Sequence, residues 1–548
     1  MRIAIAQVNP IVGDLAGNRG LVEQAAVRAA NEGADLVVLP ELVLTGYPPM
    51  DLLSRDGFVD DQLRELEALL PASRNVAIAL GAVVRAPDER PKRLWNACVV
   101  LAGGAQVAVR PKTLLPTYDV FDEKRYFARA EPREGVQIPG LEPILGIAVC
   151  EDTWVEQIEY DVDPVAELQS MGARIILNPS ASPWHAGKAR ERRAMLSALA
   201  RDRGVAIVFT NQVGGNDELI FDGGSCAIDA SGRLRAALPL FEPGFVTVEL
   251  PTTDPSAPGL EVDDPSEVQQ LEAGLVLGIR DYFEKQNLPP GAVIGLSGGI
   301  DSAVTAHLAV EALGPDRVLG VAMPGPYSSE HSIEDALELG RLLEIEVRRV
   351  DIRPIYDSYL SLFGELFGDR QDYGLTQQNI QSRIRGATLM AVSNHENRLV
   401  LATGNKSELS VGYCTLYGDT VGGLAVLGDV YKRDVYALAV HANRDRARIP
   451  KNTIEKPPSA ELAPDQLDTD DLPSYDVLDA VLEQAIEGER GREALVTPPE
   501  ASAEIARGII RRLDRNEYKR RQTPLVLRTS PKAFGRGRRL PIVHRYEG

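Results

Sequence analysis

Val293-Ile294-Gly295-Leu296-Ser297-Gly298-Gly299-Ile300-Asp301-Ser302 is the stretch that decides the fold of the second half of the chain. Its first residues belong to an apolar run that predicts a buried strand, and the residues from Ser302 onward carry apolar side chains at helical spacing. Two adjacent glycines flanked by serines join the strand to the helix. Glycine lets backbone N–H groups approach an anion closely, and the helix N-terminus adds the positive end of its dipole. The stretch therefore predicts a strand–loop–helix site for phosphate.

Two other nucleotide-binding loops are excluded, because no Gly-Lys-Ser/Thr follows the glycines and the spacing is not GxGxxG. A carboxylate inside a phosphate site would repel the phosphate unless a divalent cation lay between them, so Asp301 is predicted to be a Mg²⁺ ligand. The alternative is a strand-to-helix turn that only needed small residues. The acidic residue directly after the glycines suits a bare turn poorly.

The segment from Ser297 to Ser302 resembles the SGGxDS loop of the N-type ATP pyrophosphatases. The resemblance implies that the loop binds the pyrophosphate of ATP, that a carbonyl oxygen is adenylated and that an amine then displaces AMP. NAD synthetases, GMP synthetases and asparagine synthetases share this loop. It therefore indicates the chemistry but not the substrate.

Composition sets outer limits on the protein. A chain of 548 residues should hold two or three domains, and a net charge of -20 argues against general nucleic-acid binding. The first residues enter a strand pattern directly, without a signal peptide, and no run approaches the ~18 apolar residues of a membrane span. The four cysteines (Cys98, Cys150, Cys226 and Cys414) are far apart and form no CxxC motif. We expect a cytoplasmic protein with reduced thiols.

In residues 1–250, short apolar strands alternate with helical stretches, which predicts an α/β fold. The predicted strands are 3–7, 36–40, 76–80, 98–101, 144–149, 175–178, 205–210 and 225–229, and the predicted helices include 19–32 and 59–70. The carboxyl ends of buried strands are natural places for reactive groups.

Three reactive residues stand at such strand ends: Glu41, Lys112 and Cys150. A thiol nucleophile needs a base to take its proton and a cation to stabilise the negative charge that develops on the substrate oxygen. Glu41 and Lys112 could supply these two functions. Each residue also has an ordinary interpretation, because buried cysteines are common and charged residues often begin loops. Spacing alone leaves both interpretations open.

The local sequences around these residues carry a second resemblance. Leu39-Pro40-Glu41-Leu42, Arg110-Pro111-Lys112-Thr113-Leu114-Leu115-Pro116 and Val149-Cys150-Glu151-Asp152-Thr153-Trp154 resemble the three motifs of the nitrilase, or carbon–nitrogen hydrolase, superfamily. The resemblance covers residues 1–250 and implies an αββα sandwich. It implies that Glu41 is the general base, Lys112 the oxyanion stabiliser and Cys150 the nucleophile. Glu123 matches an additional glutamate that many members place beside the lysine.

Similarity to the glutaminase branch of that superfamily implies a glutamine site. Tyr118, Ser182 and Lys188 would hold glutamine, with Ser180 as a close rival to Ser182. His185 is interpreted as a surface or wall residue, because the thiol already has its base.

Residues 251–265 are rich in proline, threonine, serine and aspartate at their start and are predicted to be a linker lying against the surface. In residues 266–548, a helix over 267–286 precedes the phosphate loop, and strands over 317–323, 346–351 and 399–403 alternate with helices. This predicts a doubly wound parallel sheet with ligands at the carboxyl ends of its strands. Glu408 follows the last of these strands and is the natural second metal ligand beside Asp301. The alternative for Lys406-Ser407-Glu408 is a solvated turn.

Further motifs distinguish among the pyrophosphatase families. Residues 379–385, 402–408, 418–419, 432–433 and 455–462 together resemble the NAD synthetases, with Ser459 where many members have threonine. With the nitrilase-like half in front, the chain resembles the glutamine-dependent NAD synthetases. The residues implied for ATP are Gly295, Leu296, Ser297, Gly298, Gly299, Ile300, Asp301, Ser302, Thr403 and Lys432. Those implied for deamido-NAD are Asn379, Glu408, Asp419 and Lys519.

The resemblance implies hydrolysis of glutamine at one site and Mg²⁺- and ATP-dependent amidation of deamido-NAD at the other, in a homo-oligomer that binds neither nucleic acid nor membranes. Three alternatives stay open. The acyl acceptor could be another acid, or the chain could be an amide hydrolase regulated by nucleotide. Residues 511–545 contain twelve Lys and Arg against two Asp and Glu, so an RNA-binding tail is the third alternative. The interleaved glycine, proline and apolar residues favour an ordered segment that closes over an anionic substrate or packs on a partner subunit.

Overall fold

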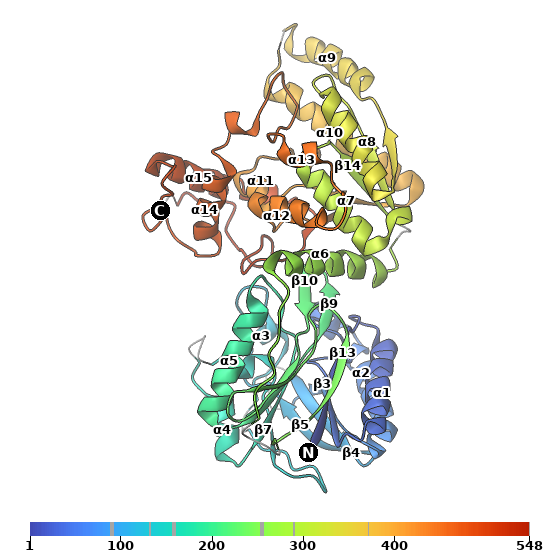
Figure 1. Ribbon diagram of the computed structural model, residues 1–548, viewed down its shortest axis with the longest axis vertical. Coiled ribbons are helices and arrows are strands. Elements are labelled where there is room, and N and C mark those ends of the chain that lie inside the picture. The colour runs from blue at the N-terminus through green and yellow to red at the C-terminus, as the bar shows by residue number, and fades with distance from the viewer. Residues whose placement is uncertain are drawn as a thin grey trace. The chain divides into compact units, whose positions relative to one another are not determined.

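The computed structural model describes residues 1–87, 93–130, 133–155, 160–252, 257–288, 291–370 and 372–546. The chain forms two compact units, Met1–Pro265 and Ser266–Gly548 (Figure 1). Four of the residues in the predicted linker, 253–256, lie outside the described part. The carbonyl groups of Ala257 and Pro258 accept hydrogen bonds from Arg235 at 3.0 and 3.1 Å, so this part of the linker lies against the first unit.

The first unit is built on two sheets. One has the strand order β13-β1-β2-β3-β4-β5 and the other the order β12-β11-β8-β7-β6. The strands of the first sheet are β1 (Arg2–Gln7), β2 (Leu36–Val38), β3 (Ala77–Arg85), β4 (Leu94–Ala102), β5 (Ala105–Pro111) and β13 (Gly244–Glu249). Those of the second are β6 (Leu145–Ile147), β7 (Ile175–Ser180), β8 (Ala206–Asn211), β11 (Cys226–Ile228) and β12 (Leu234–Ala237). A separate hairpin pairs β9 (Val213–Asn216) with β10 (Leu219–Asp222).

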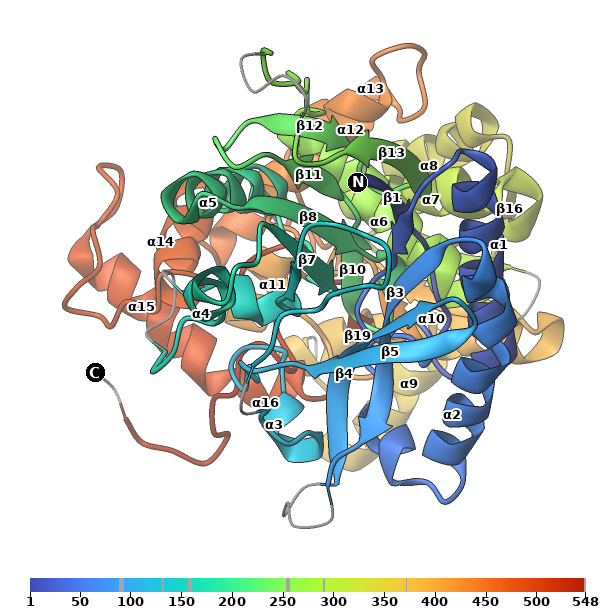
Figure 2. The same ribbon diagram turned by 90° about the horizontal axis from the view of Figure 1, so that it is seen from below.

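Helices cover the outer face of each sheet, as Figure 2 shows for α1 (Leu15–Asn31) and α2 (Phe58–Ala68) on one side and α4 (Pro164–Ser170) and α5 (Lys188–Arg203) on the other. One apolar cluster lies between the sheets and joins Ile5 and Val38 to Ile147 and Val208. One further apolar cluster lies between each sheet and the helices that cover it. Because the central strands are buried on both faces, their sequences are almost continuously apolar. The predicted αββα sandwich is confirmed.

A close approach of two chain segments fixes the place of Glu41. The segment after β2 turns past β3 at Gly81, where a Cβ atom would lie 2.1 Å from the backbone nitrogen of Leu42. Only glycine allows this contact, so Gly81 lets the residue that follows Pro40 enter the space beside the sheet.

The second unit contains a single parallel sheet with the strand order β16-β15-β14-β17-β18-β19. Its strands are β14 (Ala292–Leu296), β15 (Val318–Ala322), β16 (Glu346–Arg349), β17 (Leu399–Ala402), β18 (Leu424–Ala425) and β19 (Leu525–Val526). In chain order the sheet reads 3-2-1-4-5-6, so its direction reverses between β14 and β17. A doubly wound sheet binds ligands at the carboxyl ends of the strands at this point. The predicted doubly wound fold is confirmed.

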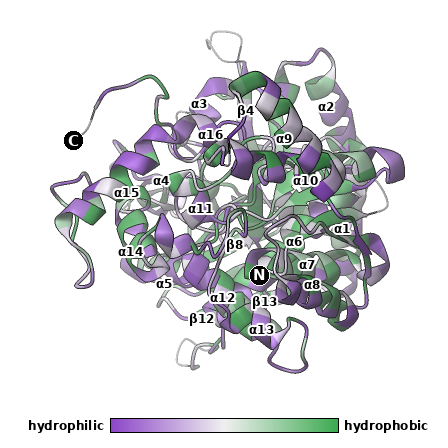
Figure 3. Ribbon diagram, turned by 90° about the horizontal axis from the view of Figure 1, so that it is seen from above, coloured by the Kyte–Doolittle hydropathy of each residue, from purple (hydrophilic) through white to green (hydrophobic). Residues whose placement is uncertain are grey.

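Helices cover this sheet and extend beyond it. They include α6 (Glu267–Glu284), α7 (Ile300–Leu313), α8 (Glu330–Leu343), α9 (Arg353–Phe367), α10 (Leu375–Glu396), α11 (Lys406–Val411), α12 (Lys432–Ala442) and α13 (Lys451–Glu455). Beyond the sheet, α14 (Tyr475–Ile486) and α15 (Ala503–Arg515) pack with α11 around Leu409, Leu482 and Ile510, followed by α16 (Glu517–Arg520). Figure 3 shows hydrophilic and hydrophobic residues alternating along α15, as expected for a helix with one buried face.

Candidate active sites

The first candidate site lies at strand ends of the first unit. Glu41 follows β2, Lys112 follows β5, and Cys150 begins the 3₁₀ helix η3 (Cys150–Thr153) shortly after β6. The three side chains are almost fully buried, with exposed fractions of 0%, 1% and 5%. Two of these strands belong to one sheet and the third to the other, so the sandwich brings the residues together between its layers.

Lys112 is held between two carboxylates. Its Nζ lies 2.7 Å from Glu41 Oε1 and 2.7 Å from Glu123 Oε1. Asn96 Nδ2 donates to Glu41 Oε1 at 2.6 Å, and the backbone amide of Ala181 donates to Glu41 Oε2 at 3.0 Å. These donors fix the orientation of the Glu41 carboxylate from three sides.

The charges of this group influence one another strongly. Burial raises the pKa of Glu123 to about 7, although the nearby ammonium of Lys112 opposes the shift. Burial lowers the pKa of Lys112, but the carboxylates of Glu123 and Glu41 raise it by more, and the net shift is well upward. Lys112 therefore stays a cation, as an oxyanion stabiliser must, while Glu123 can take up a proton near neutral pH.

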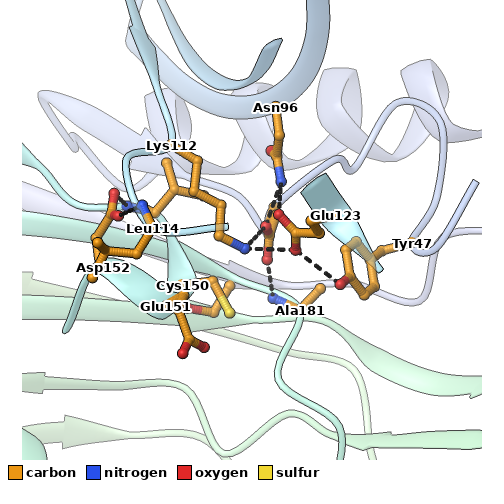
Figure 4. A network of polar contacts seen from close by, with 12 residues as sticks. Tyr47, Asn96, Lys112, Leu114, Glu123, Cys150, Glu151, Asp152 and Ala181 are labelled. Atoms are coloured by element: carbon orange, nitrogen blue, oxygen red, sulfur yellow. Dashed lines mark hydrogen bonds and ion pairs between the residues drawn. The ribbon is translucent and has the colours of Figure 1, made fainter. Parts of the chain in front are cut away.

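Cys150 has an unusual backbone conformation, with φ at 44°. Such strain in a non-glycine residue is often found at functional sites. Figure 4 shows the sulfur of Cys150 on the side of Lys112 and of the backbone of Ala181. Burial raises the pKa of the Cys150 thiol well above its ordinary value, the carboxylate of Glu41 raises it further, and Lys112 lowers it. The thiol is therefore protonated at neutral pH and needs a base beside it to react.

Asp152 connects the segments that carry Lys112 and Cys150. Its carboxylate accepts hydrogen bonds from the backbone amides of Thr113 at 3.1 Å and Leu114 at 2.7 Å, and from that of Val149 at 3.0 Å. The first two amides follow Lys112 and the third precedes Cys150. One buried carboxylate thus fixes the relative positions of Lys112 and Cys150.

The residues predicted to bind glutamine surround this group. The hydroxyl of Tyr118, which is 42% exposed, donates to Glu151 at 2.9 Å, and Lys188 Nζ lies 3.9 Å from the centre of the Trp154 ring. Ser180, the fully buried last residue of β7, donates from its hydroxyl to Asn178 at 3.2 Å, which favours Ser182 as the glutamine contact. The glutamine-binding roles stay predictions.

The second candidate site is a cavity of about 300 Å³ in the second unit. The whole segment from Gly295 to Ser302 except Gly298 lines it, together with Thr403, Glu408 and Lys432. Gly298 has φ at 77°, and a Cβ atom on it would lie 2.3 Å from the carbonyl oxygen of Ser332. The loop therefore requires glycine at this position, which explains its bare backbone beside the cavity.

Two carboxylates and a lysine meet beyond the carboxyl ends of β14 and β17. Lys432 Nζ lies 2.5 Å from Asp301 Oδ2 and 3.4 Å from Glu408 Oε1. Asn405 donates from Nδ2 to Asp301 Oδ1 at 2.8 Å, and its Oδ1 accepts the backbone amide of Glu408 at 3.0 Å. One asparagine therefore links the two acidic residues across the point where the sheet reverses direction.

These acidic residues fit a Mg²⁺ ion that is shared with a bound phosphate. Burial raises the pKa of Glu408 to about 8, and the charge of Asp301 contributes. Within the described part of the chain, no three His, Cys, Asp or Glu side chains converge on a complete metal site. Mg²⁺ usually takes one or two carboxylates together with waters and substrate phosphates, and Asp301 and Glu408 supply that donor set. The ammonium of Lys432 lies between them, where it offsets their charge.

The predicted deamido-NAD residues differ in their surroundings. Asp419 lines the cavity, and burial raises its pKa to about 6. Asn379 accepts a hydrogen bond from Thr415 Oγ1 at 2.9 Å, and Lys519 donates to the carbonyl groups of Gly412 and Cys414. Neither Asn379 nor Lys519 is among the described residues that line the cavity. Their contact with substrate stays a prediction.

Comparison with known proteins gives the two units separate relatives. The carbon-nitrogen hydrolase family matches residues 2–254, and the NAD synthase family matches residues 271–523. The curated glutamine-dependent NAD(+) synthetase of Synechocystis sp. is 42% identical over 99% of this chain and 99% of its own length. The chain belongs to the glutamine-dependent NAD(+) synthetase family.

Other members of the family agree with this assignment. The glutamine-dependent NAD(+) synthetase of Thermotoga maritima is 38% identical over 100% of this chain and 99% of its own length. The solved structure of the Acinetobacter baumannii glutamine-dependent NAD+ synthetase in complex with ADP is 37% identical, covers 99% of this chain and 98% of that chain, and superposes with a TM-score of 0.76.

Several residues of this family member escaped the sequence analysis. Asn96 lies mid-strand in β4, and Tyr47, whose hydroxyl donates to Glu123 at 3.0 Å, lies in a loop. Asp468 lines the cavity and accepts the hydroxyl of Tyr475 at 2.8 Å, and it lies outside the motifs, shortly after 455–462. No local signal marks these residues. Asn405, in contrast, precedes a helix with a glutamate three residues later, which is the pattern of a capping box.

The alternative of a solvated Lys406-Ser407-Glu408 turn is wrong. Lys406 and Ser407 are fully buried, and Lys406 Nζ lies 2.7 Å from Asp429 and 2.6 Å from Glu487. The charged side chain of Lys406 therefore lies in the core of the unit and not in solvent. No described helix of this family member is long and apolar enough to cross a membrane.

Proposed function

We propose that this chain makes NAD from deamido-NAD, ATP and glutamine, with glutamine hydrolysis in the first unit and amidation in the second. The observation that carries the proposal is the joint occurrence of a buried cysteine–glutamate–lysine group and a glycine-rich phosphate loop with two acidic residues, in a chain that its curated relatives match from end to end. Residues 1–250 would form the glutaminase, 251–265 the linker and 266–548 the synthetase.

Glutamine would react at Cys150. As the sulfur adds to the carboxamide carbon, the thiol proton passes to Glu41, and Lys112 faces the oxygen that becomes negative. Glu41 then returns the proton to the leaving nitrogen, which departs as ammonia and leaves a thioester. Water, deprotonated by Glu41, hydrolyses the thioester and releases glutamate.

The raised pKa of Cys150 supports this role for Glu41, because a thiol that stays protonated must give up its proton within the reaction. Glu123 would support Lys112 and, with a pKa of about 7, can adjust the charge of the group. Tyr118, Ser182 and Lys188 would hold the glutamine substrate.

In the second unit, the carboxylate of deamido-NAD would attack the α-phosphorus of ATP and displace pyrophosphate. Ammonia would then attack the adenylated carboxyl carbon and displace AMP, which gives NAD. The loop from Gly295 to Ser302, with Thr403 and Lys432, would hold ATP. Mg²⁺ held by Asp301 and Glu408 would supply charge compensation for the phosphates.

The remaining assignments are also proposals. Asn379, Glu408, Asp419 and Lys519 would contact deamido-NAD. All four cysteines are free thiols, which supports a reducing, cytoplasmic location. We expect a homo-oligomer. The internal pairing of basic residues such as Arg520 and Arg538 with Glu517 does not favour an RNA-binding tail.

The experiment that tests the proposal is a product analysis of one reaction that contains ATP, deamido-NAD and glutamine. We expect NAD, AMP, pyrophosphate and glutamate in equal amounts. Release of ADP and phosphate, or glutamate release without NAD, would contradict it. A screen of other carboxylic acids for pyrophosphate release tests whether the acyl acceptor is a different one.

A further inference from the structure

The short helix α11 carries one of the two acidic residues of the synthetase site. It spans Lys406–Val411, and Glu408 lies in its first turn. A helix this short is not stable on its own, because the cost of nucleation exceeds the gain from so few hydrogen bonds. The position of Glu408 therefore depends on whatever holds the two ends of α11.

The carbonyl groups at the C-terminal end of α11 are bound by one segment from much later in the chain. Arg520 Nη1 donates to the carbonyl of Ser410 at 2.6 Å and to that of Leu409 at 3.3 Å. Asn516 Nδ2 donates to the carbonyl of Val411 at 2.9 Å. Positive charge at this end of a helix also complements the helix dipole.

The same segment continues past the end of the helix. Lys519 Nζ donates to the carbonyl groups of Gly412 at 2.7 Å and Cys414 at 2.8 Å. Gly412 has φ at 69°, and a Cβ atom there would lie 2.1 Å from Asn516 Cγ. The close contact of the two segments thus depends on a glycine.

Arg520 is itself fixed in place. It is 6% exposed, forms an ion pair with Glu517 at 3.0 Å, and lies 4.9 Å from the centre of the Phe534 ring. The described N–H donors of Arg520 go to Glu517 and to backbone carbonyl groups. The guanidinium is therefore used within the protein and is not a cation that binds substrate.

The N-terminal end of α11 is held by the chain that follows Arg520. Lys406 Nζ donates to Ser530 Oγ at 2.7 Å and to the carbonyl of Lys532 at 3.0 Å. Asp429, its ion-pair partner, accepts the backbone amide of Thr529 at 2.8 Å. Residues 516–532 therefore hold α11 at both ends.

We propose that residues 516–532 hold α11 in place at the synthetase site and that Arg520 is a positioning residue for Glu408. This inference rests on the proposed function, because it assigns a role in that reaction to the basic C-terminal segment. The segment acts through α11: its side chains bind backbone carbonyl groups rather than nucleic acid or substrate phosphates.

The test compares Arg520→Met with a matched control, Arg507→Ala, in the full-length chain. Arg507 is an exposed arginine on α15, in the same part of the unit. NAD formation from ammonium chloride, ATP and deamido-NAD is measured together with the thermal unfolding temperature. Because displacement of a catalytic group by about 1 Å can cost about 100-fold, Arg520→Met should raise the KM for ATP and lower kcat, each by about 5-fold or more. Arg507→Ala should match the wild type.

The possible outcomes separate the two proposals. If the wild type and Arg507→Ala make no NAD, the proposed function fails. If they make NAD and Arg520→Met keeps the wild-type KM, with kcat reduced only in proportion to its folded fraction, the positioning role is wrong. Should Arg520→Met not fold, Asn516→Ala, which removes the donor to Val411, is judged by the same KM criterion.

Discussion

Replacing Lys112 by methionine is the most severe test of the buried ion pairs that Lys112 forms with Glu41 and Glu123 in the first unit. The ammonium is 1% exposed and lies 2.7 Å from both Glu41 and Glu123. Removing one partner of a buried ion pair costs about 3–5 kcal/mol, since it leaves an uncompensated charge. The pKa of Glu123 is already about 7, so this carboxylate can take up a proton and keep the cost near the lower limit.

We therefore expect Lys112→Met to lower the free energy of unfolding of the first unit by about 3 kcal/mol, which is a fall of about 6–12 °C in its unfolding temperature. Glutamate release should disappear. Adding Glu123→Gln to Lys112→Met removes one of the two carboxylates and should restore about half of the lost stability.

Differential scanning calorimetry measures these changes, with Lys124→Met as the control. Lys124 is an exposed lysine on α3 (Glu123–Tyr126). A fall of less than about 2 °C for Lys112→Met, or a further loss of stability in the double variant, would refute the reasoning, because it would mean that the buried ammonium does not compensate the carboxylates.

Three further predictions concern other parts of the two sites. Asp152→Ala leaves three buried amides without their acceptor, at about 1–3 kcal/mol each, so it should abolish glutamate release and destabilise the first unit in a denaturant titration; wild-type stability would contradict this. Gly298→Ala, at φ 77° and with its Cβ 2.3 Å from Ser332, should stop ATP-dependent pyrophosphate release, and undiminished release would show that the loop tolerates a side chain. The pKa of Glu408 is raised from 4.5 to about 8, so the protonated carboxyl stabilises the folded state. This stabilisation is fully present below about pH 4.5 and is lost as the pH rises through about 8. Glu408→Gln has no carboxyl group to titrate, so its free energy of unfolding relative to that of the wild type, measured in urea, should rise by about 2 kcal/mol between pH 6 and 8.5. A constant difference would be evidence against the raised pKa.

Much of the fold could be predicted because the strands of both units are buried on both faces. Such strands are short, apolar and bounded by turn residues, so 36–40, 175–178 and 292–296 stand out from the sequence. Residues at the ends of those strands, such as Glu41 and Asp301, were found by the same logic. The strand predicted over 36–40 ends at Val38 in β2, and the short strands β9, β10, β12, β13, β18 and β19 were not predicted at all.

The rest depends on contacts between residues that are far apart in the chain. β13 pairs with β1 across more than 230 residues, and Asn96 reaches Glu41 from the middle of a strand, so neither leaves a local signal. The sequence around Lys406 is hydrophilic, yet the lysine is buried because Asp429 and Glu487 converge on it from later in the chain. Likewise, the basic character of residues 511–545 gave no hint that Arg520 binds the end of a helix.

The central claim is that two separate sites contribute to one product: the first releases ammonia from glutamine, and the second uses ammonia to make NAD. A single assay tests this claim most directly. NAD formation by Cys150→Ser and Asp301→Asn is measured with glutamine and with ammonium chloride as nitrogen donors, while glutamate release is followed in parallel. Cys150→Ser should make NAD from ammonium but not from glutamine, because serine in this site lacks a reactive thiol. Asp301→Asn should make NAD from neither donor and still release glutamate. Loss of the ammonium reaction in folded Cys150→Ser, or near wild-type NAD formation by Asp301→Asn, would contradict the account.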